Sequence, residues 1–122
     1  MPLRRIRLEL ARDHDHPNGS SEHGYDFIAP LDADGHLDAA EWRQHRDRCR
    51  VKRFWAHQPD EIGRLVHRRN SWVFDYNPKS DSDDEPGFKF DQHRFVPGEY
   101  VSITEHDRVQ RTFHIRSVVD LD

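Results

Sequence analysis

The fold class is decided most clearly by residues 97–115, which read PGEYVSITEHDRVQRTFHI. The dipeptide Pro97-Gly98 predicts a turn. Apolar residues then alternate with polar ones on both sides of a polar loop, Glu105–Arg108, as is typical of two strands with one buried face. This stretch therefore predicts an antiparallel β-hairpin. The residues predicted to point inward are Val101, Ile103, Val109, Phe113 and Ile115.

The same period of two recurs in the rest of the chain. It predicts strands near residues 6–10, 25–31, 51–56 and 72–76, with loops at 13–24, 59–61 and 77–87. Residues 62–67 fit a helix or a strand, and the strand is favoured because the apolar run 72–76 needs a partner. About six to seven strands and one short helix predict a mainly β single domain over residues 1–122. We expect a small barrel or a strongly curved antiparallel sheet, with a split α+β sheet as the alternative.

The one helix is predicted from about residue 39 to residue 48. Asp38 can accept a hydrogen bond from a backbone N–H of the first turn, and Glu41 can reach back to the N–H of Asp38. The apolar stripe of this helix is thin. We therefore predict a surface helix that is attached to the core chiefly by Trp42.

Residues 32–41, DADGHLDAAE, also match the second half of a calcium-binding EF-hand loop. Pro30 stands where the first ligand is required, and residues 17–29 do not predict an entering helix. We therefore interpret the segment as a turn followed by a helix cap. Its carboxylates at ligand positions are Asp32, Asp34, Asp38 and Glu41.

Composition limits the size of the core and indicates the cell compartment. Hydrophobic and charged residues each make up 34% of the 122 residues, so the core is small. The single cysteine, Cys49, excludes an internal disulfide and makes a cytoplasmic location the default expectation. We interpret Cys49 as a structural thiol, since no base is predicted beside it.

Charge is distributed unevenly along the chain, whose net charge is −4. Residues 42–69 carry a net charge of +6, whereas residues 1–41 carry −5 and residues 70–107 carry −6. The basic segment predicts a binding face for an acidic protein surface or a nucleic-acid backbone, with a solvated basic surface beside acidic loops as the alternative. Its aromatic residues, Phe54 and Trp55, are expected in the core. The predicted basic face consists of Arg43, Arg46, Arg50, Arg53, Arg68 and Arg69.

Histidines and carboxylates offer further candidate sites. The closest group among the ten histidines is His14, His16 and His23, which could share a metal ion, although no specific zinc spacing is present. The alternative is a polar surface loop. The acidic run 81–85 has no apolar flanks, so none of its carboxyls is expected to have a raised pKa.

The chain resembles a group of short bacterial proteins to which no activity is assigned. The motifs that carry the resemblance are Asp-Gly-x-Leu-Asp at 34–38, Trp-x-Phe-x-Tyr at 72–76 and Pro-Gly-Glu-Tyr-Val-Ser-Ile at 97–103. We expect a cytoplasmic, non-catalytic binding module without a cofactor, in which homodimer formation would bury further apolar surface. A metal-binding protein is the second hypothesis and an enzyme of unrecognised type is the third.

Overall fold

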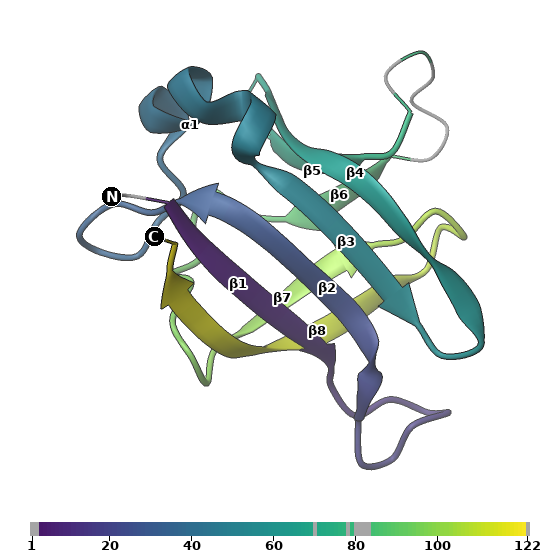
Figure 1. Cartoon of the computed structure of the whole chain (residues 1–122). Helices are drawn as coiled ribbons and strands as arrows, with labels where there is room; N and C mark the ends of the chain where they lie inside the picture. Colours follow the sequence, from purple (N-terminus) through teal and green to yellow (C-terminus); the bar gives the residue numbers. More distant parts are fainter. Residues whose placement is uncertain (1–2, 70, 78, 80–83, 122) are drawn as a thin grey trace.

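A closed barrel of eight antiparallel strands is the main feature of the computed structural model, which describes residues 3–69, 71–77, 79 and 84–121 (Figure 1). Each strand pairs with the next, and β8 pairs with β1 to close the barrel. The strands are β1 (Leu3–Leu10), β2 (Ser20–Pro30), β3 (Arg50–Trp55), β4 (Gln58–Arg68), β5 (Ser71–Asp75), β6 (Glu85–Phe88), β7 (Tyr100–Thr104) and β8 (Gln110–Asp120).

The predicted mainly β class and the barrel are confirmed. The described residues form eight strands rather than six to seven, and the split α+β sheet is not observed. The additional strand is β6, which falls in a segment predicted to be a loop. Closure pairs both edges of the sheet, so neither edge strand is left with free backbone N–H and C=O groups along its length.

Alternation places the core inside the barrel. In the C-terminal hairpin, four of the five residues predicted to point inward are at most 2% exposed, whereas Val109 is 46% exposed. The prediction for Val109 was wrong because this residue precedes β8 and still belongs to the turn region. In β1 the apolar residues Leu3, Ile6 and Leu8 are fully buried.

Two predicted connections are placed differently in the structure. The chain reverses at Ala56–His57, where His57 has a φ of 66°, so residues 59–61 lie inside β4 and do not form a turn. The predicted loop 13–24 is shorter, because β2 already begins at Ser20. Residues 62–67 are a strand, as favoured.

The helix covers one end of the barrel (Figure 1). It comprises α1 (Ala39–His45), followed by a 3₁₀ turn, η1 (Arg46–Arg48). Trp42 is 5% exposed, and its Nε1 donates to the carbonyl of Leu65 at 2.9 Å. Within the described residues no helix has the length and apolar character needed to cross a membrane.

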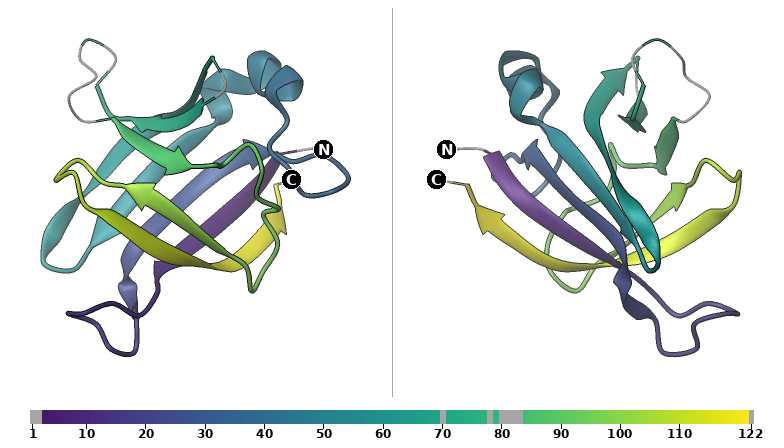
Figure 2. Two further views of the ribbon diagram at one scale, coloured as in Figure 1. Left: turned by 180° about the vertical axis from the view of Figure 1, so that it is seen from behind. Right: turned by 45° about the vertical axis from the view of Figure 1, so that its right-hand side comes forward.

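The opposite end of the barrel is called the mouth here. Connections in such a barrel alternate between its two ends. The β3–β4 and β7–β8 turns project at the mouth, away from α1 and the two chain ends (Figure 2). Residues next to these two turns contact one another although they are about 50 residues apart in the sequence, as Arg53 and Glu105 do.

Candidate functional site

A network of charged side chains is buried just inside the mouth. Glu85 on β6 and Glu105 at the end of β7 are 0% and 1% exposed. The Tyr25 hydroxyl lies 2.9 Å from Glu85 Oε1 and 2.6 Å from Glu105 Oε2. Two cations neutralise Glu105: Arg53 Nε donates to Oε2 at 3.2 Å, and Arg111 Nη1 donates to Oε1 at 2.7 Å.

The carboxyl of Glu85 has a raised pKa. Burial raises its pKa and the charge of Glu105 adds to this, whereas hydrogen bonds from Tyr76 and Tyr25 lower it only in part. Tyr76 donates to Oε1 at 2.8 Å, and the backbone N–H of His106 donates to Oε2 at 3.0 Å. The expectation that no carboxyl of the acidic run has a raised pKa was therefore wrong. Residues 81–83 of that run lie outside the described residues.

His106 lies beside this carboxyl at the surface of the mouth. Its Nδ1 is 2.7 Å from Glu85 Oε2, an ion-pair distance, but the direction of the contact does not suit a hydrogen bond. Its Nε2 is 3.7 Å from Glu61 Oε2. Glu61 also lies 3.4 Å from Arg53 Nη1, so the partly exposed pair Glu61 and His106 is linked to the buried network.

Arg53 is not part of an exposed basic face, which corrects the sequence prediction. Its side chain points into the barrel and the residue is 7% exposed. Burial alone would lower its pKa, but the neighbouring groups Glu105, Tyr25 and Glu85 outweigh burial and raise the pKa. Arg53 therefore stays charged as the central cation of the network.

A pocket of about 200 Å³ opens above this network. Trp55 forms part of its wall and faces the Cζ atoms of Arg53 and Arg111, which lie 4.5 Å and 5.6 Å from its ring centroid. The pocket thus combines an aromatic surface with guanidinium groups. Its lining residues are Arg53, Trp55, Gln58, Glu105, His106, Asp107 and Arg111.

A second depression, here called the outer groove, lies on the outside of β1–β4 and has a volume of about 390 Å³. Strand register brings its side chains together: Arg5 is opposite Ile28, and Lys52 is opposite Ile62. Ile62 is 55% exposed. The side chains that line the outer groove from the solvent side are Arg5, Asp26, Ile28, Arg50, Lys52 and Ile62.

The other arginines of the predicted basic face are not all free to contact a partner. Arg50 lines the outer groove, whereas Arg68 is paired with Asp75 at 2.7 Å and also with Asp84. Arg43 in α1, Arg46 in η1 and Arg69 directly after β4 are exposed, and none of them lines the outer groove or the pocket at the mouth. The sequence analysis did not identify Arg5 and Lys52 as groove residues. Strand alternation does indicate that both side chains point to the outside of the sheet, because each lies next to an apolar residue that is buried, Ile6 or Val51.

The structure brings together two of the three histidines predicted to bind metal. The rings of His16 and His23 are 4.8 Å apart, while the His14 side chain is exposed. His16 Nδ1 contacts Asp13 at 3.1 Å, and His23 Nδ1 contacts Ser20 Oγ at 2.7 Å. The metal site at His14, His16 and His23 stays a prediction.

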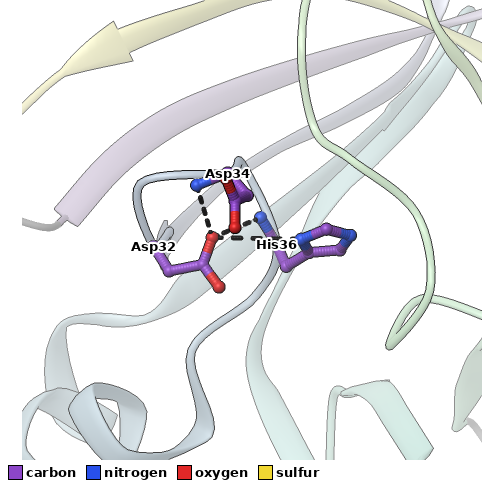
Figure 3. A group of neighbouring side chains, drawn as sticks. All are labelled: Asp32, Asp34 and His36. Carbon is purple, nitrogen blue, oxygen red and sulfur yellow. Dashed lines mark hydrogen bonds and ion pairs between the residues drawn. The ribbon is translucent and has the colours of Figure 1, made fainter.

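Among the described residues, three potential metal ligands gather instead at Asp32, Asp34 and His36, with ligand atoms within 4.8 Å of one another (Figure 3). Asp32 Oδ1 accepts hydrogen bonds from the backbone N–H groups of Asp34 and His36, at 2.9 Å and 3.0 Å. These bonds lower the pKa of Asp32 and hold the turn. An EF-hand loop is preceded by a helix, but this loop is preceded by the strand β2. The carboxylates are therefore explained by their role in the turn and not by an EF-hand calcium site.

Cys49 is buried and forms no disulfide; it lies between η1 and β3. Burial raises the pKa of its thiol to about 11, despite the nearby charge of Arg48. A high pKa and lack of exposure are the opposite of what a nucleophilic cysteine requires. This agrees with a structural thiol.

Comparisons of this chain with protein-family models, with curated proteins and with solved structures find no match. The functional argument therefore rests on the residues described above.

Proposed function

We propose that this protein is a non-catalytic binding module whose outer groove holds an acidic segment of a partner protein. The observation that carries the proposal is the arrangement of three cations, Arg5, Arg50 and Lys52, around the exposed Ile62 and the partly buried Ile28. Such a surface complements a segment in which acidic and aliphatic residues alternate. The proposal keeps the predicted basic face but moves its centre to the outside of β1–β4.

The cations of the groove are only partly neutralised within the protein. Asp26 is the carboxylate that lines the groove, and it contacts Arg7 at 3.0 Å and Lys52 at 4.0 Å. In the described part of the chain, neither Arg5 nor Arg50 forms an ion pair. Two positive charges are therefore free to attract a partner, and most strongly at low salt.

The aliphatic character of the groove favours a protein over a single-stranded nucleic acid. Sequence-tolerant binding of nucleic acid relies on aromatic side chains that stack on bases. Here the apolar side chains that reach the groove are the exposed Ile62 and the partly buried Ile28, whereas the neighbouring Phe54 ring is covered by Arg7 at 4.4 Å. The net charge of −4 also opposes a long polyanion.

The proposal can be tested with a fluorescent peptide of alternating glutamate and leucine, by fluorescence anisotropy at low salt. We expect saturable binding that the double variant Arg5→Glu/Arg50→Glu weakens about tenfold or more, which corresponds to roughly 1.4 kcal/mol. The matched control is Arg43→Glu/Arg46→Glu, which reverses two exposed charges near α1. Equal loss in both variants, or tighter binding of random single-stranded RNA than of the peptide, would overturn the proposal.

A metal-binding protein remains the second candidate, because His16 and His23 lie ring to ring beside Asp13. Neutral imidazole is a good ligand for zinc, nickel and iron. Elemental analysis of tag-free protein tests this candidate: about one metal ion per chain, lost in His16→Ala/His23→Ala, supports it. Sub-stoichiometric metal rejects it.

We further infer a cytoplasmic location from the single free cysteine. Homodimer formation is proposed for the protein without its partner segment, through Ile62 and Val119, which are each more than half exposed. Because Ile62 also lines the outer groove, the dimer and the partner segment would compete for this surface. Sedimentation equilibrium over a range of concentrations tests it, and a single monomeric mass at all concentrations rejects the dimer.

A further inference from the structure

We propose that the pocket at the mouth is a separate binding site for a small oxyanion, a carboxylate or a phosphate. This site is independent of the outer groove, because the two share no lining residue: the pocket is formed by the strand ends that flank the β3–β4 turn and by the β7–β8 connection with the start of β8. A pocket of about 200 Å³ admits a small ion or a small carboxylic acid. It excludes a folded partner.

The pocket has a surplus of hydrogen-bond donors. A guanidinium group carries five N–H bonds. Arg111 directs its Nη atoms to Glu105 and Asp107, which leaves its Nε–H without a described partner. Arg53 uses Nε for Glu105 and Nη1 for Glu61, so its Nη2 group is also without a described hydrogen-bond partner.

The carboxylates that face the pocket are already occupied. Glu105 accepts three hydrogen bonds, from Tyr25, Arg53 and Arg111. Asp107 accepts from the backbone N–H of Val109 at 3.0 Å and from Arg111 at 3.1 Å. Within the lining itself the formal charges of two guanidiniums and two carboxylates cancel, while Glu61 and Glu85, which do not line the pocket, also contact Arg53.

The donors are held in place before any ligand arrives. Ion pairs with Glu105 fix both guanidiniums, and Arg53 also stacks on Trp55 at 4.5 Å. Planar guanidinium groups match the geometry of carboxylates and phosphates. Because fewer side-chain rotamers have to be ordered on binding, even a small ligand can bind measurably.

Trp55 provides a built-in reporter for the test. It lines the pocket, whereas Trp42 and Trp72 are 5% and 2% exposed. We would titrate the protein with sodium phosphate and, separately, with sodium acetate, at an ionic strength held constant with sodium chloride. We expect a saturable change in tryptophan emission with at least one of these anions, and its identity distinguishes the two ligand classes. The change should disappear in Trp55→Phe.

Two variants decide whether the signal comes from the pocket. Arg111→Gln should weaken binding about tenfold or more, and the control Arg108→Gln, on the β7–β8 turn just before β8 and outside the lining, should not. Since Arg111→Gln also removes ion pairs, circular dichroism must show that it folds. Gln58→Glu adds a carboxylate to the lining at an exposed position and should abolish binding without unfolding the protein.

A linear, non-saturating response to both anions would overturn the proposal. The same holds if binding is unchanged in Gln58→Glu, because a second negative charge in the lining must repel an oxyanion there. Loss of anion binding in Arg108→Gln as well would locate the site elsewhere on the turn and would also reject the pocket.

Discussion

Arg53 is the cation that holds the mouth together. Its guanidinium lies within 3.6 Å of three glutamates, Glu61, Glu85 and Glu105. A charge buried among such partners has lost its hydration, so the ion pairs have to compensate for that loss. Removal of this one residue would leave two almost fully buried carboxyls without their central counter-charge.

We therefore predict that Arg53→Met lowers the free energy of unfolding by about 3–5 kcal/mol. The matched change Arg50→Met, on the exposed side of the same strand, should alter it by less than about 0.5 kcal/mol. Urea unfolding followed by tryptophan fluorescence measures both variants. Similar effects of the two changes would show that the network contributes little to stability.

Cys49 gives a second prediction at this scale. With a pKa of about 11 and full burial, only about one thiol in a thousand is a thiolate at pH 8. A disulfide reagent should therefore label the native protein at least about 100-fold more slowly than the same protein unfolded in urea. Equal labelling rates would show that the thiol is accessible and that the structural interpretation is wrong.

The helix α1 begins at the cap residue that the sequence predicts, Asp38. Asp38 Oδ1 accepts from the N–H of Glu41 at 3.1 Å, as predicted. The reciprocal bond from the Glu41 side chain is not formed, because the Asp38 N–H donates to the carbonyl of Pro30 at 3.0 Å. Glu41 instead lies 3.5 Å from His45, one turn further along.

Because Asp38 forms its capping hydrogen bond and Glu41 does not, we expect the two residues to contribute differently to stability. Asp38→Ala should destabilise the protein by about 1 kcal/mol, since it leaves a first-turn N–H without its acceptor. Glu41→Ala should cost less than about 0.5 kcal/mol, since it removes only an exposed pair. Chemical denaturation compares the two variants. An equal or larger effect of Glu41→Ala would mean that the complete capping box forms in solution.

At the scale of the whole molecule, barrel closure brings carboxyls from β6 and β7 to one end. Glu85 and Glu105 are 20 residues apart in the sequence, and Tyr25, which bridges them, comes from β2. No local pattern specifies such a cluster. It forms because strands that are distant in sequence share one interior.

The raised pKa of Glu85 predicts how stability depends on pH. A carboxyl with a raised folded pKa binds its proton more tightly in the folded protein than in the unfolded chain. Its contribution is fully present below its ordinary pKa of 4.5 and is lost as the pH rises through the folded pKa. Glu85→Gln cannot ionise, so this variant should gain stability relative to the natural protein as the pH rises above 4.5. Urea unfolding at several pH values measures the difference, and a constant difference would contradict the raised pKa.

The sequence by itself determined the elements with a clear local signal. Alternation specified β1, β2 and the C-terminal hairpin, and Asp38 marked the start of the helix, because both signals depend on neighbours within a few residues. It missed β6, whose Glu-Pro-Gly-Phe sequence has no strand alternation. It also missed the inward position of Arg53, although Val51, two residues earlier on the same face, pointed to it.

Only the tertiary structure decided which charges are buried and which remain on the surface. Glu85, Glu105 and Arg53 are typical surface residues by type, and they enter the core because closure offers each an opposite charge or a hydrogen-bond donor. The outer groove has the same origin, since strand register sets Arg5 beside Ile28 and Lys52 beside Ile62. The cost of burying a charge depends on partners that are distant in the sequence, so a reading of the chain by local patterns could not place these residues.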